Sequence, residues 1–134
     1  MQAIWDFFKK DRFAAHSGIE LLEIVEGRAK AKMPIQDCHR NGVGTVHGGA
    51  IFTLADLVFA AASNSYGTVA VAINAGIWFV KAARDGALYA EAREVSQNPK
   101  LAVYAIEVTD DAGDLIAKFE GMVYRKKDPI TPQA

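Results

Sequence analysis

The sequence predicts an α+β fold in which one long central helix is wrapped by a curved antiparallel sheet of five to six strands. Residues 48–64 form the longest helical pattern, and they are apolar around nearly the whole circumference, as in a helix buried on all sides. Short alternating segments lie on both sides of this helix and are separated by turn residues, which is typical of antiparallel strands. A curved sheet can enclose a single apolar helix of this kind.

The other elements follow in order along the chain. Residues 4–13 predict one short amphipathic helix, and a polar loop over residues 35–46 leads into the central helix. The expected strands cover residues 19–26, 28–33, 69–80, 87–95, 101–109 and 115–125. The whole chain, residues 1–134, is predicted to be a single domain, with residues 128–134 as a flexible tail.

Composition favours a soluble protein of the reducing cytoplasm. The chain is 51% hydrophobic and 23% charged, and its net charge of −1 argues against a nucleic-acid partner, which usually requires a basic surface. The single cysteine, Cys38, excludes an intramolecular disulfide. Residues 1–10 lack the apolar run of a signal peptide, and no segment approaches the roughly 18 apolar residues of a membrane span.

A glycine-rich loop runs directly into the central helix. It begins at Asn41 and ends in His47-Gly48-Gly49. Glycine lets a backbone approach a ligand closely, and the unpaired N–H groups at a helix start suit an anion or a developing oxyanion. A tight loop whose glycines serve packing alone is the alternative.

Asp56 is a carboxylate in the middle of the apolar helix. Burial of an unpaired charge is costly, so such a residue favours a functional role. An exposed position or a structural ion pair is the alternative, but no basic residue lies three or four positions away. Gly48 and Asp56 are separated by about 12 Å along a helix. If both act on one carbonyl, they must come from different subunits, which predicts a two-fold dimer with shared sites.

The histidines do not form a metal site. The three histidines and Cys38 lack a metal-ligand spacing, and no Gly-x-Ser-x-Gly motif is present, so we expect neither a metal nor a serine triad. His47 is interpreted as a structural hydrogen bonder, and His16 and His39 are given no role.

The step of seven residues from Gly49 to Asp56, together with His47-Gly48, resembles the hotdog-fold thioesterases, and most closely the PaaI branch of phenylacetic acid degradation. The resemblance continues through residues 77–79, 86–92, 104–108 and 117–125. It implies hydrolysis of acyl-CoA without a bound cofactor, because CoA arrives with the substrate. It also implies dimers joined through their sheets, a homodimer or a homotetramer.

The resemblance also implies roles for individual residues. Asp56 resembles the catalytic carboxylate, and the Gly48 amide resembles the oxyanion donor, with Gly49 beside it in contact with substrate. Asn41 resembles a loop residue that orients the nucleophile or water. His47 occupies a supporting position in the catalytic group.

Two stretches depart from the pattern of relatives. Val80-Lys81-Ala82 replaces an Arg-Pro pair near the CoA path, which leaves Lys81 as the candidate contact to CoA. Asn74 is the candidate substitute for a Ser or Thr that contacts the acyl group in relatives. The acyl group itself is left open.

Several alternatives stand beside thioester hydrolysis by Asp56. Asp56 could activate water as a general base or attack the carbonyl directly. A hotdog dehydratase acting on hydroxyacyl thioesters would need a catalytic histidine, for which His47 is available. A noncatalytic acyl-CoA binding module would tolerate loss of the Asp56 charge.

Overall fold

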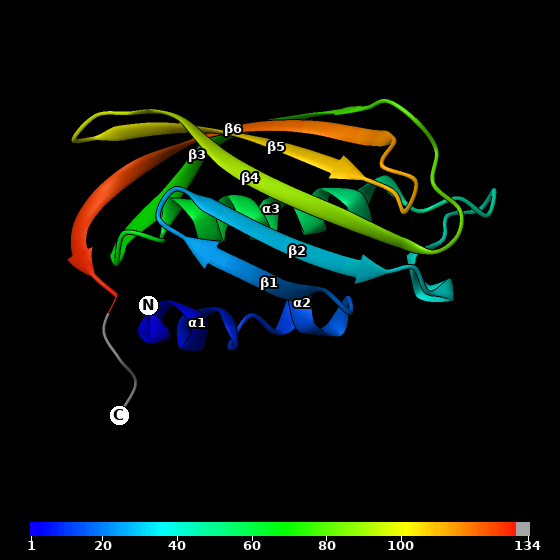
Figure 1. The fold of residues 1–134 in the computed structure, drawn as a ribbon, viewed down its shortest axis with the longest axis horizontal. Helices are drawn as coiled ribbons and strands as arrows, with labels where there is room; N and C mark the ends of the chain where they lie inside the picture. Colours follow the sequence, from blue (N-terminus) through cyan, green and yellow to red (C-terminus); the bar gives the residue numbers. More distant parts are fainter. Residues whose placement is uncertain (131–134) are drawn as a thin grey trace.

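The computed structural model describes residues 1–130 and shows one antiparallel sheet curved around a long helix (Figure 1). The strands are β1 (Glu20–Val25), β2 (Arg28–Pro34), β3 (Thr68–Phe79), β4 (Ala87–Gln97), β5 (Leu101–Thr109) and β6 (Leu115–Pro129). The helices are α1 (Gln2–Phe8), α2 (Arg12–His16) and α3 (Gly48–Ser63), and a 3₁₀ turn covers Asp37–His39. The six strands lie in the order β1-β2-β4-β5-β6-β3. The predicted hotdog fold is confirmed.

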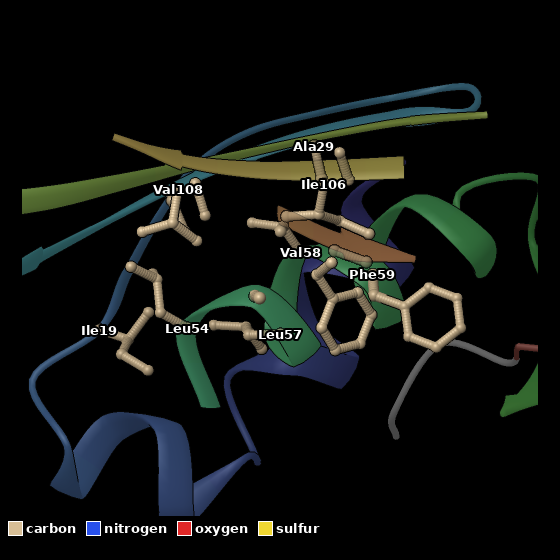
Figure 2. Close-up of a cluster of buried hydrophobic side chains, with 14 of the residues drawn as sticks. Ile19, Ala29, Leu54, Leu57, Val58, Phe59, Ile106 and Val108 are labelled. Carbon is tan, nitrogen blue, oxygen red and sulfur yellow. The ribbon is translucent and has the colours of Figure 1, made fainter. Parts of the chain in front are cut away.

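α3 lies across the concave face of the sheet because it is apolar on nearly all sides. Leu54 and Val58 have no exposed surface, and Phe59 is 1% exposed. Figure 2 shows these side chains beneath Ile106 and Val108 of β5, in the same cluster of buried residues. The helix has 16 residues, and within residues 1–130 no helix is long and apolar enough to cross a membrane.

The sheet makes room for Phe59 at Gly121 of β6. A Cβ atom at Gly121 would lie 2.5 Å from Cζ of Phe59, so only glycine fits there without a shift. Phe119, two residues earlier, faces the same side and contacts Phe59 with ring centroids 5.5 Å apart. Because side chains alternate along a strand, Glu120 and Met122 face the opposite, convex side of the sheet. This alternation also determines which residues of the paired strand β3 face the helix.

The N-terminal segment forms two short helices instead of the single helix predicted over residues 4–13. Asp11 separates them: its Oδ1 accepts the N–H of Ala14 at 2.9 Å, which caps the start of α2. Ile4, Phe8 and Ala14 are buried in the core. The two helices lie below β1 in Figure 1, and α2 contacts α3.

β6 is longer than predicted. The strand continues to Pro129, which pairs with Thr68 of β3. Pairing of Arg125 with Ala70 and of Pro129 with Thr68 holds both ends of this polar stretch against β3, across a register shift. Residues 128 and 129, the first of the predicted flexible tail, belong to β6, and residues 131–134 of that tail lie outside the described part of the chain.

The two edge strands of the sheet differ in length and exposure. β1 has six residues and a bulge between Leu21 and Glu23, two features that discourage pairing with another strand. β3 has twelve residues and is exposed along most of its length, with Ile73 at 54% and Trp78 at 60%. A long apolar edge of this kind offers its backbone to another strand. β3 is therefore the open edge of the single chain.

Candidate active site

The side chain of Asn41 organises the glycine-rich loop between β2 and α3. Its Oδ1 accepts the N–H groups of Val43 and Thr45, both at 3.1 Å, and its Nδ2 donates to Oγ1 of Thr45 at 2.8 Å. Gly44 has a φ of +85°, a left-handed conformation that favours glycine. The side chain of Asn41 thus holds the loop that leads into the helix. Orientation of a water by its second Nδ2 hydrogen stays a prediction.

The first turn of α3 has one backbone N–H without a partner among the described residues, and that group belongs to Gly48. His47 is the N-cap and binds the other three. Its Nδ1 accepts the N–H of Gly49 at 2.8 Å, and its carbonyl accepts those of Ala50 at 2.9 Å and Ile51 at 3.2 Å. Only the Gly48 N–H is therefore available to a ligand at the positive end of the helix dipole.

Gly49 contributes to this arrangement by having no side chain. A Cβ atom at Gly49 would lie 2.9 Å from Nδ1 of His47, too close for the capping hydrogen bond to keep its geometry. Because the Gly49 N–H is already donated to that ring, it is not free for a substrate. Gly49 therefore helps His47 to cap the helix, and a substrate contact by Gly49 other than through its N–H stays a prediction.

The end of β3 borders the helix start. A Cβ atom on Gly48 would lie 3.2 Å from Cζ of Phe79, so the aromatic ring covers one side of Gly48. Phe79 is itself 55% exposed. Since β3 is the open edge of the sheet, the unpaired Gly48 amide lies next to the surface where a second chain would pair.

Asp56 lies about two turns farther along α3, and its side chain is partly exposed and partly buried in the single chain. Partial burial is the larger of two causes that raise its pKa above the ordinary 3.8, and the negative charge of Asp11 is the second. The two candidate groups, the Gly48 N–H and the Asp56 carboxylate, are separated by about 12 Å along the helix axis. One protomer therefore does not bring them to the same carbonyl.

Asn74 does not lie at the helix start. It pairs with Met122 of β6, and a directly paired residue faces the same side of the sheet as its partner. Met122 lies next to Gly121, which faces Phe59 of α3, so Met122 and Asn74 face the convex side. The sheet therefore lies between this side chain and α3 of the same chain, and the acyl contact by Asn74 stays a prediction.

Lys81 lies two residues beyond Phe79 but is paired with the turn between β5 and β6. Its Nζ lies 2.6 Å from Oδ2 of Asp114 and 3.7 Å from Oδ2 of Asp110. The hydrogen bond to Asp114 raises the pKa of Lys81. Its positive charge is thus balanced within the chain, and the predicted contact to CoA would require Lys81 to leave these carboxylates.

Two residues near the site were missed by sequence reasoning. Asp11 carries an N-cap signal that is readable in the sequence, but its proximity to Asp56 depends on how α2 packs. His39 is 4% exposed, and both of its ring nitrogens have hydrogen-bond partners. No local pattern indicates this burial, because the segment that covers the ring lies about twenty residues earlier.

Comparison of sequences places these residues in a known family. The thioesterase superfamily matches residues 43–117, more than half of the chain and a span that contains both Gly48 and Asp56. A relative from Archaeoglobus fulgidus is 44% identical over 126 residues, which cover 93% of this chain and 82% of the relative. Acyl-coenzyme A thioesterase PaaI of Escherichia coli K12 is 34% identical over 128 residues, covering 95% of this chain and 91% of that protein.

Solved structures agree with this assignment. The E. coli PaaI protein from the phenylacetic acid degradation operon matches with a TM-score of 0.90 and 32% identity, over 96% of both chains. A Streptococcus mutans protein solved with bound acetyl CoA matches with a TM-score of 0.78 and 25% identity, over 83% of this chain and 90% of that one. The chain therefore belongs to the thioesterase superfamily and is a thioester hydrolase with a PaaI-like hotdog fold.

Proposed function

We propose that the protein hydrolyses acyl-CoA thioesters to a free acid and CoA in a site shared by two protomers. The observation that carries this proposal is the unpaired Gly48 N–H on the same helix as the exposed Asp56 carboxylate, too far away to act with it in one chain. The acyl-coenzyme A thioesterase name of the E. coli relative supports the reaction. The acetyl CoA bound to the S. mutans protein supports the choice of CoA esters.

Gly48 supplies the electrostatic half of the site. Attack on a thioester carbonyl places negative charge on its oxygen, and a fixed N–H at the positive end of a helix stabilises that charge. His47 binds the neighbouring N–H groups of the first turn, so the capped helix presents the Gly48 donor in a fixed direction. His47 therefore acts in support and takes no proton from the substrate.

Asp56 of the other protomer supplies the reacting carboxylate. It removes a proton from the attacking water, or it attacks the carbonyl carbon and forms a mixed anhydride that water then cleaves. A pKa raised above the ordinary value makes the carboxylate a stronger base and brings its pKa closer to the operating pH, which favours general base catalysis. In both routes the thiolate of CoA leaves, and no bound metal or further cofactor takes part.

The open edge of β3 is the surface that joins the two protomers in this proposal. Pairing of two β3 strands about a two-fold axis would extend one sheet into the next and cover the exposed apolar side chains. Phe79, at the end of β3, would bring the Gly48 amide of each protomer close to its partner. A homodimer is the smallest assembly that completes the site, and a homotetramer would contain two such dimers.

Release of free thiol from a panel of aromatic and aliphatic acyl-CoAs tests this function. Wild type should turn over one or more of these substrates, and Asp56→Asn should lose about 100-fold or more in kcat. Asp6→Asn, which removes an exposed carboxylate from α1, is the matched control and should behave as wild type. Near-normal turnover by Asp56→Asn would contradict the assignment of Asp56.

The same panel separates the two rival functions. Binding of CoA esters by the folded oligomer without any thiol release would favour a noncatalytic binding module. Formation of an enoyl thioester from a hydroxyacyl-CoA, with the thioester intact, would favour a dehydratase. Either result would overturn the proposed hydrolysis.

A further inference from the structure

His39 is a buried histidine whose ring joins two separate segments of backbone. Its Nδ1 accepts the N–H of Gln36 at 3.0 Å, and its Nε2 lies 2.6 Å from the carbonyl oxygen of Ser17. Because Nδ1 accepts a hydrogen bond, the ring hydrogen is on Nε2 and is donated to Ser17. Ser17 is the C-cap of α2, so the ring fixes the 3₁₀ turn after β2 against the end of that helix.

The backbone of His39 holds the residue that precedes Gly48. Its carbonyl accepts the N–H of His47 at 2.7 Å. The next pair inward, Arg40 and Val46, forms an isolated antiparallel bridge, and Val46 also donates its N–H to the carbonyl of Ala83 at 2.9 Å. These hydrogen bonds hold His39 and His47, the residues that flank the two ends of the glycine-rich loop, next to each other.

Only a few backbone torsions lie between the hydrogen bond from His47 to His39 and the Gly48 N–H, the proposed oxyanion donor. Between the His47 N–H, which His39 holds, and the Gly48 N–H lie only the two backbone dihedrals of His47, φ −62° and ψ 136°. We propose that His39 is a positioning residue for hydrolysis, whose ring anchors the turn on α2 and whose carbonyl thereby sets the direction of the Gly48 amide. This inference rests on the proposed role of Gly48.

Three substitutions of His39 separate its two ring hydrogen bonds. His39→Phe keeps a ring and removes both bonds, His39→Asn keeps an acceptor near Nδ1, and His39→Gln keeps a donor near Nε2. A displacement of about 1 Å at a catalytic group can cost about 100-fold in rate, so we expect kcat of His39→Phe to fall about 10- to 100-fold. KM should stay within about twofold, because the buried ring does not touch the substrate. His39→Asn and His39→Gln should recover part of the lost kcat.

Ser65→Ala is the matched control for loss of buried hydrogen bonds. Ser65 is 3% exposed, accepts the N–H of Gly27 at 2.7 Å and donates to the carbonyl of Ala62 at 2.6 Å. It lies just beyond the opposite end of α3 from Gly48, so its loss should lower the melting temperature and leave kcat unchanged. Wild-type kcat in folded His39→Phe would overturn the proposal. So would an equal loss of kcat in Ser65→Ala at a similar melting temperature.

The backbone amide resonance of Gly48 gives a second measurement that does not depend on activity. In nitrogen-15-labelled protein this resonance should shift or broaden in His39→Phe, recover in part in His39→Asn or His39→Gln, and stay in place in Ser65→Ala. An unmoved Gly48 resonance in His39→Phe would overturn the proposal. If wild type hydrolyses no acyl-CoA, the proposed function fails, and the resonance alone then decides whether His39 holds the Gly48 amide.

Discussion

Replacement of Gly48 by proline removes one N–H and changes little else. Gly48 is the first residue of α3, where proline is well tolerated because this N–H has no partner within the helix. His47 has φ −62° and ψ 136°, the extended conformation that a residue before proline favours. The folded structure should therefore accept Gly48→Pro after a small movement of Phe79, whose ring lies 3.2 Å from the new Cβ position.

We expect Gly48→Pro to lower kcat about 100- to 1,000-fold, which corresponds to about 2.7–4 kcal/mol of lost transition-state stabilisation. The other three N–H groups of the first turn are bound by His47, so no neighbouring donor can replace the missing one. Thiol release at saturating acyl-CoA measures kcat, and a thermal melt on the same sample checks that the variant is folded.

Gly48→Ala is the control for this experiment. It places the same Cβ atom against Phe79 but retains the N–H, so it should keep most of the wild-type kcat. Equal losses of kcat in the alanine and proline variants would mean that crowding against Phe79, and not loss of the N–H, lowers the rate. Wild-type turnover by folded Gly48→Pro would show that stabilisation of the oxyanion does not depend on this amide.

Three further predictions address the carboxylate, the core and the open edge. Asn can replace Asp11 as the N-cap of α2 while removing the charge that raises the pKa of Asp56. Asp56 should then lose its proton at lower pH, and the acid limb of the kcat/KM profile of Asp11→Asn should move to lower pH; an unmoved limb would contradict the coupling. Gly121→Ala places a methyl 2.5 Å from Phe59, and it should lower the free energy of unfolding in urea by about 1–3 kcal/mol. Stability equal to that of wild type would mean that the ring can move without cost. Ile73→Lys adds a charge to the exposed edge of β3 and should give inactive monomers in light scattering, whereas active monomers would argue against a shared site.

Local sequence patterns predicted most of the fold because they depend on short-range physics. A helix over residues 48–64 follows from an apolar circumference, and the structure ends it one residue earlier. The break at Asp11 also has a local signal, an N-cap residue before a short helix. The extension of β6 to Pro129 has none, because it depends on pairing of Arg125 and Pro129 with the distant strand β3.

The site was predictable to the extent that it depends on helix geometry. The separation of Gly48 and Asp56 follows from the rise per residue alone. The direction of Asn74 depends on pairing between distant strands and on a register shift between Ala72 and Asn74, which the sequence does not reveal. The Gly49 N–H donates to His47 only because the imidazole ring of His47 adopts one particular side-chain conformation. A pattern of residue types does not specify that conformation.

Mixed dimers of two inactive variants test whether the active site is shared between two protomers. Asp56→Asn retains the Gly48 amide, and Gly48→Pro retains the Asp56 carboxylate. If each site combines one group from each protomer, a mixed dimer has one intact site. Random pairing of equal amounts should then restore about a quarter of wild-type activity. If both groups act within a single chain, co-expression will restore no activity above that of the separate variants, and the two protomers then share no site.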